Sequence, residues 1–173
     1  MEDDDQAMLA FLNLSQTHVV LRAGLSRALE SEAGVGLSEI EVLRRIAVAP
    51  GERLRMRDLA DQLYVAQSGI TRIVDHLVAK DWVVREQPPD DRRTIYARLT
   101  EGGRAALCRA MPVYARTATE QLGGGLSAAD LAELRRVLRR ILERLGAWDD
   151  ERCDPRAWRG SDDDSPSDEE PGR

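Results

Sequence analysis

The fold of this chain is decided by residues 67–103, which read QSGITRIVDHLVAKDWVVREQPPDDRRTIYARLTEGG. In residues 67–80 apolar side chains recur every three or four positions, which predicts an amphipathic helix. Residues 82–85 and 94–99 predict two strands, and residues 87–91 predict a turn between them. The stretch therefore predicts a helix that is followed at once by a β-hairpin with a charged tip.

A second short helix is predicted directly before this stretch, at residues 56–63. The break at Tyr64 and Val65 separates the two helices, and about three or four residues between short helices is the spacing of a helix-turn-helix. With the hairpin behind it, this lobe is expected to be a winged helix-turn-helix. The returning strand alternates with a period of two, so we expect one face to point inward, with Ile95, Ala97 and Leu99 on it.

The outward face of the helix at residues 67–80 is rich in hydrogen-bonding side chains. Gln67, Thr71 and Asp75 lie on one stripe at intervals of four, with Ser68 and Arg72 beside them. Glutamine pairs with adenine and arginine with guanine, whereas serine and threonine contact bases or phosphates. We therefore predict that Gln67, Ser68, Thr71 and Arg72 bind DNA; an ordinary solvated face is the alternative.

Helical patterns also precede the lobe. Residues 7–33 predict a long first helix that ends before Gly34. Ser38, with Glu41 three positions on, predicts a capping box that starts a second helix near Glu39. In contrast, the starts of the third and fourth helices carry Arg55 and Ala66, which cap poorly.

Two more helices are predicted after the hairpin. Thr100 is suited to cap the first of them, which ends near Leu122, and Ser127 with Asp130 caps the second. The second carries a narrow row of apolar residues, the seam, which would be exposed to water in a soluble monomer. We expect the seam to join the first helix in a homodimer interface; packing of the two helices within one chain is the alternative. The seam consists of Leu131, Leu134, Leu138, Ile141 and Leu145.

The expected fold class is mainly α with a small β-hairpin wing (α+β), in one domain, because 173 residues are too few for two ordinary domains. Its dimerisation helices lie on both sides of the winged lobe in the sequence. The expected organisation is an acidic tail at 1–6, a domain at 7–148 with its lobe at 37–100 and dimerisation helices at 7–36 and 101–148, and a disordered acidic tail at 149–173.

Charge is distributed unevenly along the chain. It carries 25 basic and 31 acidic residues, a net charge of −6 at pH 7. Residues 149–173 hold ten of the acids and four arginines, and residues 2–5 hold four more acids, which leaves 21 basic and 17 acidic residues in 6–148. The body is therefore basic, as a partner of polyanionic DNA should be.

Several other classes of protein are disfavoured. Cys108 and Cys153 are too few for a disulfide framework or a zinc site, which suits a reducing cytoplasm. The sequence shows no signal peptide and no apolar run long enough for a membrane span. It also shows no phosphate-binding loop, nucleophile elbow or metal cluster. We expect no catalytic residue, no metal and no cofactor.

The hairpin carries the resemblance to a known family. Asp91-x-Arg93, Leu99-Thr100 and Gly102-Gly103 resemble the wing signature of the MarR family of transcriptional regulators, and residues 68–75 resemble its recognition helix. The order of elements over residues 7–146 is similar to the family's plan of four helices, a hairpin and two helices. One departure is Asp81, where the family often has glycine; aspartate tolerates a left-handed backbone better than most residues.

The resemblance implies a role for the wing. Arginine at the hairpin tip can enter the narrow minor groove of A·T-rich DNA, and the family's wing arginine does so. We assign this role to Arg93, with Arg92 second, and expect Asp91 to hold one arginine in place and Thr100 to stabilise the junction behind the wing. A surface salt bridge that only shapes the turn is the alternative.

The resemblance also implies partners. The family forms two-fold dimers on pseudo-palindromic double-stranded DNA, and its repressors commonly leave DNA when a small aromatic or phenolic ligand binds between the dimer helices and the winged lobe. His18 and Arg22 could hold an anionic group of such an effector; a surface pair or a buried, hydrogen-bonded histidine is the alternative. Alternatives are redox control through Cys108, for which passive packing is the expected role, and a winged-helix module for protein–protein contact.

Overall fold

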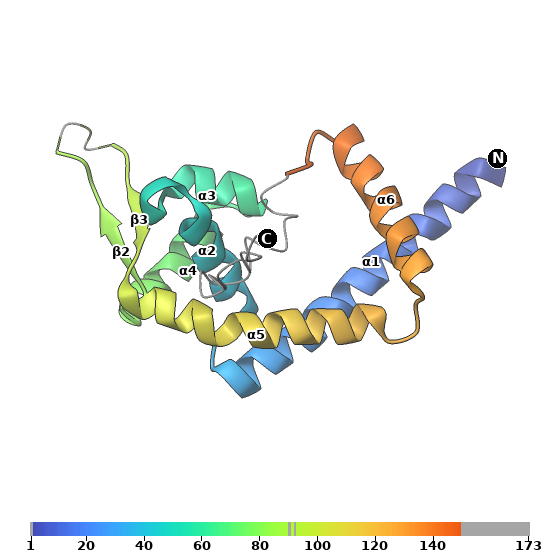
Figure 1. The fold of residues 1–173 in the computed structure, drawn as a ribbon. Helices are drawn as coiled ribbons and strands as arrows, with labels where there is room; N and C mark the ends of the chain where they lie inside the picture. The colour runs from blue at the N-terminus through green and yellow to red at the C-terminus, as the bar shows by residue number, and fades with distance from the viewer. Residues whose placement is uncertain (1, 90, 92, 150–173) are drawn as a thin grey trace, which may run out of the picture.

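A computed structural model describes residues 2–89, 91 and 93–149, and it confirms the predicted fold class. The chain is mostly helical, with a small antiparallel sheet (Figure 1). Two short helical turns, η1 and η2, interrupt the longer elements. In chain order the elements are α1 (Glu2–Ala28), η1 (Leu29–Ala33), α2 (Leu37–Val48), η2 (Pro50–Glu52), β1 (Arg53–Arg55), α3 (Met56–Leu63), α4 (Gln67–Ala79), β2 (Val83–Glu86), β3 (Tyr96–Leu99), α5 (Glu101–Gly123) and α6 (Ala128–Arg144).

The winged lobe and the outer helices lie at opposite ends of the molecule (Figure 1). The lobe gathers α2, α3, α4 and the sheet, and the hairpin of β2 and β3 projects from it. Helix α5 runs from the base of the hairpin away from the lobe and packs against α1. None of the helices in the described ranges combines the length and hydropathy that crossing a membrane requires.

The core of the lobe consists of apolar side chains from its helices and its sheet, including Leu59 of α3 and Val83 of β2. Leu43 and Ile46 of α2, Ile70 and Leu77 of α4, and Leu99 of β3 are almost completely buried. Burying each such side chain contributes about 1.5–3 kcal/mol before chain entropy is subtracted. Because the apolar residues of α2 and α4 recur at helical spacing, one face of each helix is buried in this core. The opposite face of α4 is therefore held toward solvent in a defined orientation.

The sheet has three strands in the order β1-β3-β2, so the prediction of a bare hairpin missed one strand. Strand β1 is only three residues long and pairs Arg53 with Arg98 and Arg55 with Tyr96. A run this short carries too little periodicity to be recognised in a sequence. Ala97 and Leu99 are buried as predicted, but Ile95 is 42% exposed because it lies on the hairpin beyond the start of β3.

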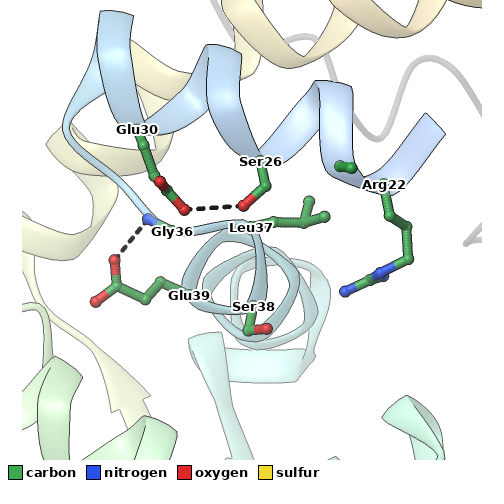
Figure 2. A pocket seen from close by; sticks show the side chains of 8 residues that line it. Arg22, Ser26, Glu30, Gly36, Leu37, Ser38 and Glu39 are labelled. Atoms are coloured by element: carbon green, nitrogen blue, oxygen red, sulfur yellow. Dashed lines mark hydrogen bonds between the residues drawn. The ribbon is translucent and has the colours of Figure 1, made fainter. Parts of the chain in front are cut away.

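Two helix starts differ from the prediction. Helix α1 begins at Glu2, so residues 2–6 continue the helix instead of forming a tail. Helix α2 begins at Leu37, and the carboxylate of Glu39 accepts a hydrogen bond from the backbone N–H of Gly36 at 2.8 Å (Figure 2). The predicted capping box of Ser38 and Glu41 was therefore wrong, because the extended backbone at Gly36 starts the helix two residues earlier.

Other local predictions are confirmed. No side chain caps α3 at Arg55 or α4 at Ala66. Asp81 takes the left-handed conformation, with φ of 57°, and Tyr64 ends α3 with φ of 55°. Ser127 and Asp130 form the predicted capping box of α6, with 3.2 Å between the amide nitrogen of Asp130 and the hydroxyl of Ser127.

The outer helices leave their apolar faces open to solvent. No residue of α6 is buried, and every residue from 4 to 20 of α1 is exposed. The alternative of α6 packed on α1 within one chain would have buried one of these faces, so the structure does not support it. The large apolar side chains that are most exposed here are Phe11, Val19, Val20 and Leu145, each between 62% and 65%.

An ion pair between Arg45 and Asp149 ties the segment after α6 to the lobe. Arg45 of α2 is only 5% exposed, and its Nη2 lies 2.8 Å from Oδ2 of Asp149. Asp149 was predicted to begin the disordered tail, but this residue is in fact held by the ion pair. The rest of that predicted tail, residues 150–173, lies outside the described residues.

We predict that Asp149→Ala lowers the free energy of unfolding by roughly 2 kcal/mol. Breaking a fully buried ion pair costs about 3–5 kcal/mol because it leaves a lone buried charge; the loss is smaller here because Asp149 remains 35% exposed. Chemical denaturation measures the change. The double variant Arg45→Met/Asp149→Ala should recover stability, since methionine fills the same space without charge; equal loss in both variants would contradict the prediction.

Candidate nucleic-acid interface

A groove of about 870 Å³ lies between α3, α4 and the hairpin. Gln67 and Thr71 line it from α4, and Arg93 lines it from the hairpin tip. The structure therefore brings together side chains of the predicted recognition helix and of the predicted wing. Three more arginines line the same groove: Arg55, Arg57 and Arg85.

The predicted contacts on α4 all point to solvent. Gln67, Ser68, Thr71 and Arg72 are exposed, whereas Ile70 on the opposite side of the helix is buried. The hydroxyl of Thr71 donates to the carbonyl oxygen of Gln67 at 2.9 Å, which leaves its lone pairs free to accept. Because no side chain caps α4, the positive end of its dipole also faces an incoming anion.

The wing is tied to α4 by an ion pair that the sequence analysis missed. Nη1 of Arg85 in β2 lies 2.5 Å from Oδ1 of Asp75, and its Nη2 donates to the carbonyl oxygen of Thr71 at 3.4 Å. Asp75 was grouped with the DNA-reading stripe, but its carboxylate is occupied by this arginine. The pair ties the first strand of the wing to α4.

The turn at the hairpin tip is organised by Asp91. Its Oδ2 accepts from the hydroxyl of Thr94 at 2.5 Å, and its Oδ1 accepts from the backbone N–H of Arg93 at 2.9 Å. These bonds, the one from Thr94 first, hold the pKa of Asp91 below its usual value. Asp91 thus holds the backbone of Arg93 and leaves its side chain exposed, while Arg92 lies outside the described residues.

The base of the wing is held by Thr100. Its hydroxyl accepts from the backbone N–H of Gly103 at 3.1 Å, which is the predicted cap of α5, and donates to the carbonyl oxygen of Asp81 at 2.7 Å. A Cβ atom at Gly103 would meet the carbonyl oxygen of Trp82 at 2.1 Å. The glycine is therefore required for the close approach of α5 to the start of the wing.

The sequence analysis missed the arginines that flank α3. Arg55 ends β1 and Arg57 lies in the first turn of α3, next to Asp58. Arg57 is 3.9 Å from Asp61, and both side chains are more than 70% exposed, so this pair is weak. The alternation in Arg53-Leu54-Arg55 was the available signal, but it is too short to be distinguished from a loop.

The proposed effector residues border a separate cavity of about 330 Å³ between α1, α2 and α5. His18 and Arg22 line it together with Tyr114 and Gln121. Arg22 does not offer an unpaired charge, because its Nη1 lies 2.6 Å from the carboxylate of Glu41. A shallower hollow of about 370 Å³ beside it, between Arg22, Ser26 and Glu39, is shown in Figure 2.

Other candidate groups are dispersed over the surface. No three histidine, cysteine or acidic side chains gather as metal ligands among the described residues. His76 is exposed, and its Nε2 lies 3.6 Å from Glu39. Cys108 is exposed on α5, so the expected packing role was wrong; its spacing between Leu107 and Arg109 did not reveal which side of α5 faces solvent. Cys153 lies outside the described residues.

A helix-turn-helix with an arginine-bearing wing, on a frame of long outer helices, defines a winged helix-turn-helix protein. Residues 33–94 match a sequence model of the family described as "MarR family". Similar proteins of Escherichia coli include the transcriptional repressor MprA, 28% identical over 64% of this chain and 63% of that protein, and the multiple antibiotic resistance protein MarR, 32% identical over 49% and 59%. The chain thus matches under two thirds of the length of these relatives.

Solved structures agree with the sequence comparisons. A DNA complex of Sco3205, a MarR-family transcriptional regulator of Streptomyces coelicolor, superposes with a TM-score of 0.71 at 28% identity, over 80% of this chain and 87% of the other. AbsC, a MarR-family regulator of the same organism, gives 0.72 at 26% identity, over 83% and 97%. The chain is therefore similar to MarR-family transcriptional regulators both in sequence and in fold.

We predict that Thr94→Val raises the pKa of Asp91 toward its usual value of 3.8, because the largest cause of its lowering is removed. With a lowered folded-state pKa, Asp91 stabilises the turn above its unfolded-state pKa and loses that effect as the pH falls through the lower folded value. NMR titration of the carboxyl carbon measures both values. Thr17→Val, which removes a hydroxyl from the exposed surface of α1, is the control and should leave the pKa of Asp91 unchanged; an unmoved pKa in Thr94→Val would refute this assignment.

Proposed function

We propose that this protein is a sequence-specific double-stranded DNA-binding transcriptional regulator, a repressor, that acts as a homodimer. The observation that carries the proposal is the groove in which Gln67 and Thr71 of α4 face Arg93 of the wing. Two similar proteins also support the proposal: MprA is named a transcriptional repressor, and the structure of Sco3205 was solved in complex with DNA.

In this proposal α4 enters the major groove. Gln67 and Arg72 contact base edges, and Ser68 and Thr71 contact bases or phosphates from the exposed face of the helix. Arg93 reaches into the adjacent minor groove, with Arg92 beside it in the sequence. Asp91 and Thr100 stabilise the wing, because they bind the tip and base of the hairpin respectively.

The homodimer follows from the open apolar faces of α1 and α6. Phe11, Val19 and Leu145 are largely exposed, and exposing such a large apolar surface is unfavourable in water. The predicted seam lies on the amphipathic helix α6 and ends at its C-cap, Leu145. A two-fold interface built from these faces would place two α4 helices about one DNA turn apart. The operator should then be pseudo-palindromic.

The cavity between α1, α2 and α5 is the proposed effector site. It lies where the outer helix α1 meets α2 of the lobe, so a ligand there could change the angle between the dimer frame and the recognition helix. Tyr114 and His18 offer stacking and hydrogen bonding to a small aromatic or phenolic molecule. Arg22 would release Glu41 and form an ion pair with an anionic group of the ligand in its place.

We also propose that the protein works in the cytoplasm without a catalytic step or a cofactor. The acidic C-terminal segment would either shield the basic groove from non-specific DNA or add solubility. Two alternatives to this function are a winged-helix module for protein–protein contact and a redox-triggered regulator that uses Cys108, which is exposed. An adaptor would bind duplex DNA with neither the affinity nor the salt dependence of a DNA-binding repressor.

We predict that Arg93→Ala weakens binding to a duplex selected from a random library by about tenfold or more, since a groove contact is worth about 1–3 kcal/mol. Fluorescence anisotropy of the labelled duplex measures this. Arg27→Ala is the matched control because it removes an exposed arginine of α1 and leaves the wing intact. If both variants bind as the wild type does, or if the wild type selects no duplex, the proposed role of the wing fails.

We predict that Leu138→Glu converts the dimer to monomers, because the new carboxylate lies in the middle of the seam and would lose its hydration there. Light scattering coupled to size-exclusion chromatography gives the mass. Ala132→Glu adds the same charge to α6 at an exposed position outside the seam and should remain dimeric. A wild-type mass of one chain would rule out the proposed interface.

A further inference from the structure

The exposed face of the three-stranded sheet carries a cluster of arginines that the proposed DNA contacts do not use. The register of β1 and β3 pairs Arg53 with Arg98 and Arg55 with Tyr96, which places all four side chains on one face. The opposite face holds Leu54, Ala97 and Leu99 against the core. We refer to Arg53, Arg55, Tyr96 and Arg98 as the outer sheet face.

Tyr96 holds two guanidinium groups in defined positions. The guanidinium carbon of Arg53 lies 5.1 Å from the centroid of the Tyr96 ring, and that of Arg55 lies 5.7 Å from it. Nε of Arg55 also donates to the hydroxyl of Tyr96 at 3.0 Å. Since stacking and hydrogen bonding restrict both side chains, less conformational entropy is lost when they bind a ligand.

Neither of these two arginines forms a salt bridge with a carboxylate among the described residues. The hydrogen bond with Tyr96 is the largest cause of the raised pKa of the Arg55 guanidinium, although Asp58 and Asp91 lie near enough to contribute to it. Arg98 is paired with Glu86, and Arg104 near the base of the sheet is paired with Glu52. By contrast, no carboxylate within the described residues lies within 4 Å of the guanidinium of Arg53 or Arg55. The outer sheet face therefore presents two fixed positive charges to solvent, which suit an anionic partner.

This face is continuous with the proposed DNA groove. Arg55 belongs to both, because it stacks on Tyr96 and also lines the groove beside Gln67 and Arg93. Arg53 lies two residues earlier on the same strand, about 7 Å further from the groove. A duplex held in the groove would thus have its backbone next to Arg55 first and Arg53 second.

From this arrangement we infer that Arg53 binds a backbone phosphate of the duplex, outside the segment that α4 and the wing tip read. A planar guanidinium donates two parallel hydrogen bonds to phosphate oxygens, and such a contact carries affinity without sequence information. The inference rests on the proposed DNA-binding function and extends it: each lobe would cover more DNA than its base contacts require. An acidic polypeptide on this face is the competing occupant.

The test is the salt dependence of binding to a labelled duplex of mixed sequence, measured with the full chain. The slope of log K against log salt is negative, and each lost phosphate contact makes it shallower by about 0.9, so Arg53→Ala should make it shallower by about 1.8 in a two-lobed complex. Arg53→Lys keeps the charge and should keep the slope. Arg27→Ala, the same loss of charge on α1, should leave it unchanged; thermal unfolding checks that all variants are folded.

The outcomes separate the inference from the function on which it rests. If the wild type binds DNA steeply and Arg53→Ala has the slope of Arg27→Ala, this inference is overturned while the DNA-binding function stands. If the wild type does not bind duplex DNA, both fail. Binding of polyglutamate by the wild type but not by Arg53→Ala, with an unchanged DNA slope, would assign the face to an acidic polypeptide and overturn the phosphate contact.

Discussion

The junction at Thr100 is the constraint on which the rest of the structure depends. Its hydroxyl joins the end of the α4 turn, at Asp81, to the first turn of α5, at Gly103, and its backbone N–H donates to the carbonyl oxygen of Trp82 at 3.1 Å. The wing, helix α4 and the long helix α5 therefore meet at one point. Because these contacts are short and directional, a movement of α5 is transmitted to the wing and to α4 together.

The surface charge of this protein depends on which arginines are paired with carboxylates as well as on how many charged residues the chain has. The chain is acidic overall, yet the groove presents Arg93 and the outer sheet face presents Arg53, while Asp75 neutralises Arg85 within the wing. Paired arginines shape the lobe, and those without carboxylate partners among the described residues are available to phosphates. The net charge of the whole chain describes neither surface, because salt screens the interaction between exposed charges that lie more than roughly 10 Å apart.

The outer helices and the lobe are linked through few polar contacts. Arg22 of α1 binds Glu41 of α2, and Arg45 of α2 binds Asp149 beyond α6. Both contacts involve α2, which also supplies the centre of the lobe's core through Leu43 and Ile46. Helix α2 is therefore, besides α5, an element through which an event in the cavity at α1 or in the outer helices would reach the groove.

The sequence by itself determined the main helices and the hairpin, because the helical period of residues 67–80, the alternation of Ala97 and Leu99, and the cap at Thr100 are local properties of the chain. Tertiary structure alone decided what the polar side chains do. Asp75 and Arg85, ten positions apart, and Arg55 and Tyr96, forty-one apart, are partners only because strand pairing and core packing bring them together. Such pairings leave no periodic trace in the sequence, so β1, the ion pair at Asp149 and the outer sheet face could be found only in three dimensions.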